Sequence, residues 1–406
     1  MNIIYDCTIL SNYNNKSGQR AGVFFTAYNI LQELLKQGHN LELYCNFTEY
    51  YKIKRIKEFS TLKLVPEYSL LNKFAGIMFY LLSFLPQRLQ PYINILTRIY
   101  SKYFYIKSKK KQEYINKFDA YFSPFTPASP EINEANIKRY RIVHDLIPVV
   151  ENGLTPEHKS WFYWFNRIYN TINEKDYYFT DSEYTKMDLL KYFPNIKSDN
   201  VRVAYLGANN RFKPDRNNNI TKKYNLSNDY VFSLCSLGKR KNLIFAITNF
   251  YNFIEKNNIN NLELVLAGGI WKSFEKKLHN TLNLYNKEKI KVLGYIPDDD
   301  LPALYSNAIM FVYPSLYEGF GLPVLEAMQC GCPVITSNAT SLPEVIGNAG
   351  IQVNPNSDEE MVAAYEKMYF DSTFRKSCQQ KGLERAKQFS WEKCTNEIVN
   401  FIQSTL

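Results

Sequence analysis

Two glutamates, Glu318 and Glu326, enclose a glycine-containing turn in the sequence Glu-Gly-Phe-Gly-Leu-Pro-Val-Leu-Glu. An apolar strand, residues 309–313, precedes this turn. A helix is predicted to begin near Leu322 or Pro323, because proline is tolerated in the first turn of a helix. Glu318 is then expected in the loop before the helix and Glu326 about one turn inside it. Two carboxylates placed in this way can accept hydrogen bonds from the hydroxyl groups of a ligand.

The predicted helix start also presents backbone amides to a ligand. The amides of Phe320, Gly321 and Leu322 have no partner within the helix and lie at the positive end of its dipole, so they suit an anion or a sugar oxygen. The two glycines allow another molecule to approach the backbone closely. The alternative is a glycine turn into a core helix with two solvated glutamates, and composition alone does not decide between them.

The elements that must position these residues alternate between strands and helices. Residues 2–10 are predicted to be a buried strand, residues 23–37 an amphipathic helix that ends at Gly38, and residues 41–45 the next strand. This β-α-β order predicts a parallel sheet. Further strands are predicted at residues 119–122, 141–144, 177–180, 201–206, 230–235, 262–267, 290–293, 309–313 and 333–336.

A polar run, residues 209–219, separates the two series of strands and is predicted to be an interdomain linker. The pattern therefore predicts two doubly wound α/β domains, with the ligand site in the cleft between them. Neither domain has Gly-x-Gly-x-x-Gly after its first strand, and neither has a Gly-Lys-Ser/Thr phosphate loop. A dehydrogenase or a P-loop nucleotidase is therefore disfavoured.

The segment from Pro314 to Asn338 resembles the signature of family 4 glycosyltransferases, which are retaining enzymes of the GT-B fold. Two glutamates with seven residues between them, around Gly-Phe-Gly-Leu-Pro, carry the resemblance. It extends to residues 240–242, 293–297, 341–345 and 348–350 and covers essentially all of the C-terminal half.

The resemblance implies two Rossmann-like domains that face a deep cleft. Residues 1–207 would form an acceptor-binding domain and residues 208–389 a domain that binds the nucleotide-sugar donor. A final helix, at about residues 390–406, would pack back onto the first domain.

The resemblance also implies roles for the residues of the turn. Glu326 would accept hydrogen bonds from the donor ribose. Glu318 would lie beside the transferred sugar as a catalytic residue that positions and stabilises, and the amides of Phe320, Gly321 and Leu322 would bind the donor.

Two further segments would complete the donor site. The backbone around Tyr295 and Ile296 would hold the base, and Arg240 and Lys241 would clamp the diphosphate. Two cations and helix dipoles can stabilise the departing diphosphate without a metal, so no metal or other cofactor is expected. Taken alone, Arg240-Lys241 is an ordinary solvated helix start. Many relatives carry Gly-Arg where this chain has Cys-Ser at residues 235–236, and the sequence leaves open whether Arg240 replaces that arginine.

The N-terminal half resembles the family more weakly. Residues 141–148 are similar to a family strand that ends in His-Asp at the edge of the cleft. His144 is the second catalytic candidate, expected to contact the donor sugar or to orient the acceptor, and Asp145 is a further candidate. Ser182, in a strand-to-helix turn at residues 179–184, would approach the donor phosphates.

The first loop, residues 17–23, is expected to supply glycine amides near the diphosphate. Gly22 is the expected amide donor and Arg20 an additional basic candidate. Ser341 and Glu344 have the spacing of a capping box, so they are predicted to start a helix and to have no catalytic role.

The net charge of +10 suits nucleic acid, an anionic membrane face or a phosphorylated ligand. Between Glu67 and Glu113 the chain has basic residues but no acidic one, and apolar residues alternate with them. Residues 74–111 are therefore predicted to form an interfacial segment at an anionic bilayer. The alternative is a core helix followed by an exposed lysine tail. The family context favours the membrane, because many relatives act on lipid-linked acceptors at the inner face of the cytoplasmic membrane.

Compartment signals are few. No signal peptide is visible, and the longest apolar run, residues 75–85, is shorter than the ~20 residues that span a bilayer. The seven cysteines are scattered and lack zinc-site spacing, so buried free thiols in a reducing cytoplasm are expected. The expected location is cytoplasmic and peripheral at the inner face of the membrane.

The expected function is retaining transfer of a hexose, from GDP-mannose or a UDP-sugar, to a glycan or lipid-linked acceptor in the synthesis of bacterial surface polysaccharide or lipopolysaccharide. One alternative is a basic α/β protein that binds membrane or nucleic acid, although no nucleic-acid-binding module is visible and no nucleic-acid partner is expected. Another GT-B enzyme, such as an epimerase, is the second alternative. The sequence leaves open the sugar, the base and the acceptor.

Overall fold

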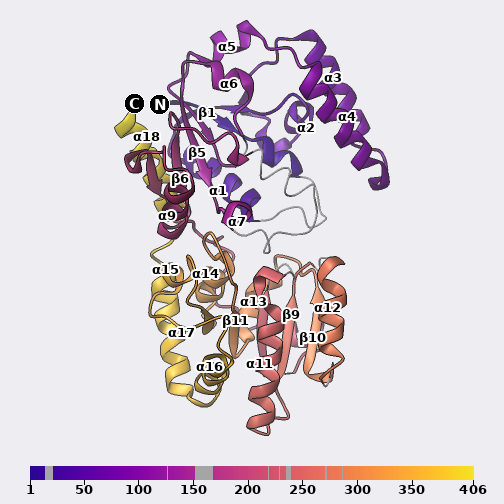
Figure 1. Ribbon diagram of the computed structural model, residues 1–406, viewed down its shortest axis with the longest axis vertical. Helices are drawn as coiled ribbons and strands as arrows, with labels where there is room; N and C mark the ends of the chain where they lie inside the picture. The colour runs from indigo at the N-terminus through magenta and orange to yellow at the C-terminus, as the bar shows by residue number, and fades with distance from the viewer. Residues whose placement is uncertain are drawn as a thin grey trace.

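The computed structural model describes residues 1–13, 22–125, 127–150, 168–217, 219–227, 229–234, 239–269, 272–285 and 287–406. Two parallel β-sheets organise this part of the chain, one in the upper and one in the lower half of the molecule as drawn (Figure 1). The two doubly wound α/β units predicted from the sequence are therefore confirmed.

The first sheet has the strand order β3-β2-β1-β4-β5-β6-β7. Its strands are β1 (Asn2–Asp6), β2 (Asn40–Tyr44), β3 (Lys63–Leu64), β4 (Ala120–Ser123), β5 (Lys138–Val143), β6 (Tyr177–Thr180) and β7 (Val201–Val203). The strand predicted over residues 2–10 ends at Asp6, because the Asp6 carboxylate accepts the amide of Thr8 at 2.9 Å and turns the chain into a short 3₁₀ helix, Thr8–Asn12.

The second sheet has the strand order β10-β9-β8-β11-β12-β13. Its strands are β8 (Tyr230–Leu234), β9 (Glu263–Ala267), β10 (Ile290–Gly294), β11 (Met310–Tyr313), β12 (Val334–Ser337) and β13 (Ile351–Val353). The strand order reverses beside β1 in the first sheet and beside β8 in the second. In open α/β sheets, ligands bind at the carboxyl ends of the strands near such a reversal.

Helices connect the strands of each sheet. In the first half these are α1 (Gly22–Lys36), α2 (Tyr50–Ile53), α3 (Leu70–Leu82), α4 (Gln90–Tyr103), α5 (Lys109–Ile115), α6 (Pro130–Glu134), α7 (Ile147–Val150) and α9 (Glu183–Tyr192). In the second half they are α10 (Asn219–Lys223), α11 (Leu243–Lys256), α12 (Lys272–Leu282), α13 (Leu301–Asn307), α14 (Leu322–Gln329), α15 (Leu342–Ile346), α16 (Asp358–Phe370), α17 (Ser372–Ala386) and α18 (Trp391–Thr405).

The last helix, α18, returns to the first sheet (Figure 1). The Phe401 ring lies 5.5 Å from the Phe179 ring of β6, and the hydroxyls of Thr405 and Tyr140 are 2.7 Å apart. The chain crosses itself at Gly207, where an added Cβ would lie 2.4 Å from the backbone nitrogen of Trp391. Only glycine allows two backbones to pass so closely.

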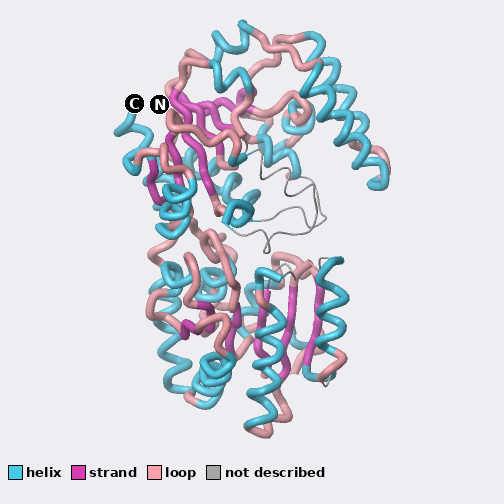
Figure 2. The backbone as a smooth tube through the Cα atoms, viewed as in Figure 1, coloured by secondary structure: helices cyan, strands magenta, loops and turns pink. Residues whose placement is uncertain are grey.

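A helical hairpin of α3 and α4 extends away from the first sheet (Figure 2). Its inner side packs through Ala75, Phe79 and Ile93 against Phe47, whereas many of its other apolar side chains are exposed. Asn72 fixes its base, because the Asn72 amide group donates to the carbonyl of Ile106 at 2.8 Å. No helix among the described residues is long and apolar enough to cross a membrane.

The basic run at the end of this region is divided by the fold. Lys109 and Lys110 are exposed, but Lys111 is buried, and its ammonium group lies 2.9 Å from the Glu67 carboxylate. Lys107 forms an ion pair with Glu134. The alternative of an exposed lysine tail is therefore wrong for Lys111, because α5 turns that side chain inward toward Glu67.

Candidate active site

The Gly-Phe-Gly turn links β11 to α14, and the helix begins at Leu322 as predicted. Gly321 has φ of +116°, and a Cβ there would lie 2.7 Å from a side-chain carbon of Leu342. The positive φ therefore requires glycine, and an added Cβ would also displace the Leu342 side chain. Ser341 holds the turn from the side, because its hydroxyl lies 2.9 Å from the carbonyl oxygen of Glu318 and 2.8 Å from that of Phe320.

The Glu318 carboxylate is the centre of a cluster of charged and hydroxyl groups. Its Oε2 lies 2.8 Å from the Arg240 guanidinium and its Oε1 lies 2.6 Å from the Lys241 ammonium. Oε1 also accepts hydrogen bonds from Ser315 at 2.6 Å and from Tyr313 at 2.9 Å. The side chains of Arg240 and Lys241 are only 16% and 10% exposed, so they are not a solvated helix start.

The strand order of the second sheet explains this cluster. Arg240 and Lys241 lie in a short 3₁₀ turn, Lys239–Lys241, between β8 and α11, whereas Glu318 follows β11. Because β8 and β11 are adjacent parallel strands, both loops leave the same edge of the sheet. The backbone joins them as well, since the amide of Leu316 donates to the carbonyl of Arg240 at 2.9 Å.

The environment keeps Glu318 ionised. Burial alone would raise the pKa of this carboxyl group, but the charges of Arg240 and Lys241 outweigh burial and lower the pKa to about 2. The cluster therefore presents a carboxylate with two cations at the edge of the sheet. A diphosphate that binds these cations must share them with Glu318 or displace it.

Glu326 lies in a different electrostatic environment within α14. Its carboxylate accepts a hydrogen bond from Tyr305 at 3.1 Å. Burial raises the pKa of Glu326 to about 7, although the hydrogen bond from Tyr305 acts in the opposite direction. The two glutamates of the turn therefore differ in charge near neutral pH, with Glu318 fully ionised and Glu326 near its midpoint.

His144 follows β5 and is held at both ring nitrogens. Nδ1 lies 2.7 Å from the Asp181 carboxylate, and Nε2 lies 2.8 Å from the carbonyl oxygen of Pro124. The carbonyl can only accept, so Nε2 carries a hydrogen, and one further proton is held between Nδ1 and Asp181. Burial would lower the pKa of His144, but the charge of Asp181 outweighs it and raises this pKa. The ring is thus fixed in orientation.

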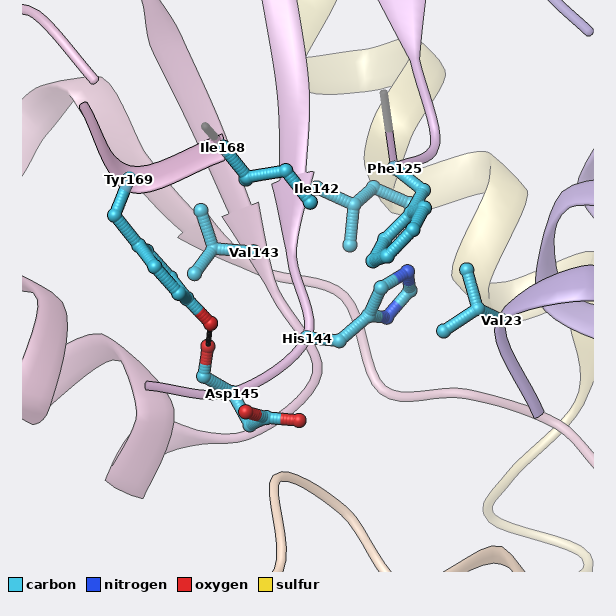
Figure 3. A pocket seen from close by; sticks show the side chains of 8 residues that line it. All are labelled: Val23, Phe125, Ile142, Val143, His144, Asp145, Ile168 and Tyr169. Carbon is cyan, nitrogen blue, oxygen red and sulfur yellow. Dashed lines mark hydrogen bonds between the residues drawn. The ribbon is translucent and has the colours of Figure 1, made fainter. Parts of the chain in front are cut away.

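A pocket adjoins His144 and Asp145, and the rings of Phe125 and Tyr169 lie along its walls (Figure 3). The Tyr169 hydroxyl donates to the carbonyl of Asp145 at 2.7 Å, and the Asp145 carboxylate accepts the amide of Ile147 at 3.0 Å. Burial raises the pKa of Asp145, whereas the nearby charge of Arg240 lowers it, and the net direction is upward. Asp145 is therefore near enough to the Glu318 cluster to sense its charge.

The backbone after His144 touches the turn of the other domain. A Cβ on Gly319 would lie 1.8 Å from the carbonyl oxygen of His144, so only glycine permits this approach. Ser182 contributes to the same contact, because its hydroxyl donates to the carbonyl of Gly319 at 2.7 Å. The structure thus brings His144, Asp145 and Ser182 together with the Glu318 turn.

The remaining candidates lie around this centre. A Cβ on Gly22, at the start of α1, would be 3.4 Å from a side-chain carbon of Leu322, so the starts of α1 and α14 are neighbours. After β10, Tyr295 is 61% exposed and Ile296 is buried. Phe320 is buried against Tyr205 and Phe389, with ring centroids at 6.3 and 5.7 Å. Arg20 and residues 235–236 lie outside the described residues.

Ser341 and Glu344 begin α15 as predicted, but the capping box itself does not form. Ser341 does precede α15, but its side chain makes no capping hydrogen bond and instead donates to the turn at Glu318 and Phe320. Glu344 accepts the amides of Glu183 and Tyr184, both at 2.8 Å, at the start of α9 in the other domain. Ser341 and Glu344 therefore bind residues that are distant in the sequence and do not bind each other through their side chains.

Sequence reasoning missed three groups that hold the candidate residues. Tyr313 and Ser315 contact Glu318, and Asp181 contacts His144. The sequence does contain an indication of the contact between Asp181 and His144. Each of these residues directly follows a strand, and the two strands, β5 and β6, are paired in the sheet. Among the described residues, no group of three His, Cys, Asp or Glu side chains could hold a metal ion.

Comparisons with known proteins point to one family. Residues 215–385 match the family described as "Glycosyl transferases group 1". The chain is 34% identical over 244 residues to O-antigen chain mannosyltransferase B of Escherichia coli, covering 59% of this chain and 63% of the relative. It is 31% identical over 289 residues to serotype-specific mannosyltransferase WbdA of Escherichia coli, covering 68% of this chain and 34% of the relative. The matches thus span less than two thirds of either relative.

The fold also has solved relatives. The structure of Anabaena Alr3699/HepE in complex with UDP and glucose has a TM-score of 0.69 to this chain, covers all of both chains and is 16% identical in sequence. At this level of identity the likeness establishes a common fold. The predicted GT-B architecture is confirmed.

Proposed function

We propose that this chain is a member of the group 1 glycosyltransferase family and transfers a hexosyl group from a nucleoside-diphosphate sugar to an acceptor hydroxyl. The observation that carries the proposal is the cluster of Glu318 with Arg240 and Lys241 beside the N-terminal turn of α14. In such a cluster the cations can bind a diphosphate. The carboxylate and the backbone amides of the turn can bind the adjoining sugar.

Each part of the donor then has a partner. Arg240 and Lys241 bind the diphosphate and stabilise the charge that grows on it as the glycosidic bond breaks. Glu326 accepts the ribose hydroxyls. The backbone at residues 295–296 contacts the base, and the amides of Phe320 and Gly321, with Leu322 at the helix start, bind the sugar end.

The acceptor domain supplies the other side of the site. His144, fixed by Asp181, faces the donor sugar or the acceptor, and Asp145 and the start of α1 at Gly22 border the same space. Residues 1–207 with α18 would bind the acceptor and residues 208–389 the donor. The contact of Gly319 with His144 supports this division, because it places the donor turn against the acceptor domain.

The proposed transfer proceeds with retention of configuration. The acceptor hydroxyl attacks the anomeric carbon on the face from which the diphosphate departs. The bond from that carbon to the phosphate oxygen breaks, the bond to the acceptor oxygen forms, and the phosphate oxygen takes the hydroxyl proton. Glu318 positions the sugar and stabilises positive charge on its ring, and does not form a covalent bond. Its low pKa suits this electrostatic role.

The proposed donor is GDP-mannose or a UDP-sugar, and the proposed acceptor is a glycan or lipid-linked saccharide of bacterial surface polysaccharide. Two relatives are named as mannosyltransferases, which favours GDP-mannose. UDP-glucose is the second donor to test, because the structure of Alr3699/HepE was solved in complex with UDP and glucose. Calorimetric titration of the protein with each nucleotide sugar tests the proposal. Submillimolar binding of one of them is expected, and absence of binding by all of them would contradict it.

The hairpin of α3 and α4 is the proposed contact with an anionic membrane at the inner face of the cytoplasmic membrane. Contiguous exposed apolar surface of this kind marks an interaction site. Lys73, Arg88, Arg98, Lys109 and Lys110 are exposed around it and suit anionic headgroups. The exposed apolar side chains of the hairpin and its end are Leu70, Leu71, Phe74, Ile77, Met78, Leu81, Phe84, Leu85, Leu89, Tyr92, Ile95, Leu96, Ile99, Tyr103, Phe104 and Ile106.

A further inference from the structure

Glu344 lies in α15 of the second domain, yet its carboxylate binds the first domain. One oxygen accepts the amide of Tyr184 at 2.8 Å, and the other accepts the amide of Glu183 at 2.8 Å and the Tyr205 hydroxyl at 3.1 Å. A carboxylate at this end of α9 is favoured by the helix dipole and by otherwise unpaired amides. This contact between the domains is therefore charge-assisted.

The same turn of α9 also holds the donor-site loop. The hydroxyls of Ser182 and Thr185 both lie within hydrogen-bonding distance of the carbonyl oxygen of Gly319, at 2.7 and 3.2 Å. Two residues before Gly319, the Tyr317 hydroxyl donates to Asp188 of α9. The residue between them is Glu318. The helix that Glu344 caps is thus attached to the loop on both sides of Glu318.

Helix α15 holds that loop from the opposite side. The Ser341 hydroxyl, just before α15, lies within hydrogen-bonding distance of the carbonyl oxygens of Glu318 and Phe320 and shares its one hydrogen between them. The Thr340 hydroxyl accepts the amide of Glu318 at 3.0 Å. The loop is therefore enclosed between α15 of its own domain and α9 of the other, and Glu344 joins these two helices directly.

We propose that Glu344 is a positioning residue for sugar transfer, which docks the first turn of α9 against residues 317–320 and so sets Glu318 and the amides of the turn in their working geometry. The inference rests on the proposed function for the role of Glu318. We expect nucleotide binding to depend little on this contact, because Arg240, Lys241 and Glu326, the residues proposed to bind the diphosphate and the ribose, all belong to the second domain. Loss of the contact slows sugar transfer without weakening nucleotide binding.

The test compares Glu344→Ala and Glu344→Gln with wild type. Glu344→Ala removes both acceptors, whereas the isosteric Glu344→Gln keeps one carbonyl oxygen for one of the two amides. Hydrogen exchange at the amides of Glu183 and Tyr184 reports the contact itself. The matched control is Glu360→Ala, which removes a carboxylate that accepts a backbone amide, that of Asn354 at 2.7 Å, within one domain.

We expect kcat for transfer to fall about tenfold or more in Glu344→Ala and by less in Glu344→Gln, with nucleotide Kd unchanged within about twofold. Both amides should exchange faster in Glu344→Ala and one of them in Glu344→Gln, and the control should match wild type. Unchanged amide exchange and unchanged kcat in Glu344→Ala would overturn the proposal. A loss of nucleotide affinity as large as the loss of kcat would also overturn it. If the wild-type protein transfers no sugar, the proposed function fails, while the exchange measurement still decides whether Glu344 docks α9.

Discussion

At the scale of single residues, the central feature is a carboxylate that neutralises the two cations proposed to bind the donor. Glu318 contacts Arg240 at 2.8 Å and Lys241 at 2.6 Å in a largely buried setting. Removing one partner of a buried ion pair leaves the others without a counter-charge, which is costly. A bound diphosphate supplies that counter-charge. Stability and nucleotide binding are therefore coupled at this residue.

Glu318→Gln should lower the free energy of unfolding by about 3 kcal/mol, since it leaves Arg240 and Lys241 without their anion. Nucleotide affinity should be kept or increased, because the diphosphate no longer competes with Glu318. Urea unfolding with and without nucleoside diphosphate measures both effects. A variant of wild-type stability, or one with much weaker nucleotide binding, would contradict this account of the cluster.

Lys241→Ala should weaken binding of UDP or GDP about tenfold, because a charge-assisted contact to the diphosphate is lost. Lys239→Ala is the matched control, since Lys239 lies in the same 3₁₀ turn but its side chain is exposed. Calorimetric titration of both variants gives the comparison. Equal nucleotide affinity of wild type and Lys241→Ala would show that Lys241 does not bind the diphosphate.

Nucleotide-sugar binding should depend on the ionisation of Glu326, whose pKa burial raises to about 7. Ribose hydroxyls donate to the carboxylate, so binding favours the ionised form and lowers this pKa. Affinity should therefore fall as pH is lowered from 7, by up to about tenfold per unit. Glu326→Gln should bind more weakly at pH 8 and show a flat profile from pH 8 to 6. A wild-type profile that is flat over the same range would count against the role of Glu326.

At the scale of elements, the sequence predicted the local structure of the site better than the contacts between residues that are distant in the sequence. The helix start at Leu322 follows from Pro323 and the preceding glycine, and the structure agrees. The contact of Arg240 with Glu318 depends on the pairing of β8 with β11, which the residue spacing does not contain. Glu344 does not act as a local cap for the same reason, since its partners lie 139 to 161 residues away.

Gly319→Ala should separate the two domains, because its Cβ would lie 1.8 Å from the carbonyl oxygen of His144. Transfer should fall about a hundredfold or more, since misplacement of the reacting groups by about 1 Å is costly. Nucleotide binding should largely persist, because the proposed diphosphate and ribose contacts, Arg240, Lys241 and Glu326, all lie in the second domain.

The control for this substitution is Gly382→Ala, where the added Cβ meets Met328 at an ordinary 3.4 Å. Transfer rates and small-angle scattering of both variants provide the measurement. Wild-type transfer by Gly319→Ala would show that the close contact is not needed for the reaction.

At the scale of the whole molecule, the basic charge and the apolar hairpin concern how the chain would meet the proposed acceptor. Burial of Lys111 against Glu67 removes one charge from the surface and anchors α5 beside the base of the hairpin. Among the described residues, most of the exposed large apolar side chains lie in the first domain, the proposed acceptor domain. This arrangement suits an acceptor presented at a lipid surface.

Replacing Phe84 and Tyr92, which are 69% and 67% exposed, by serine should reduce binding to vesicles that contain anionic lipid several-fold, because apolar area no longer enters the interface. Phe370→Ser, at 58% exposure in the second domain, is the matched control. Vesicle cosedimentation with anionic and neutral lipid measures the effect. Equal binding by all proteins would contradict the membrane proposal, and preferential binding of nucleic acid would favour the alternative.

The most direct test of the central claim is release of nucleoside diphosphate from GDP-mannose and UDP-sugars by the wild-type protein and by Glu318→Gln. We predict that wild type releases the diphosphate from one of these donors and that Glu318→Gln, though it still binds the donor, nearly loses this turnover. Full turnover by Glu318→Gln, or no release from any nucleotide sugar by wild type, would contradict the account.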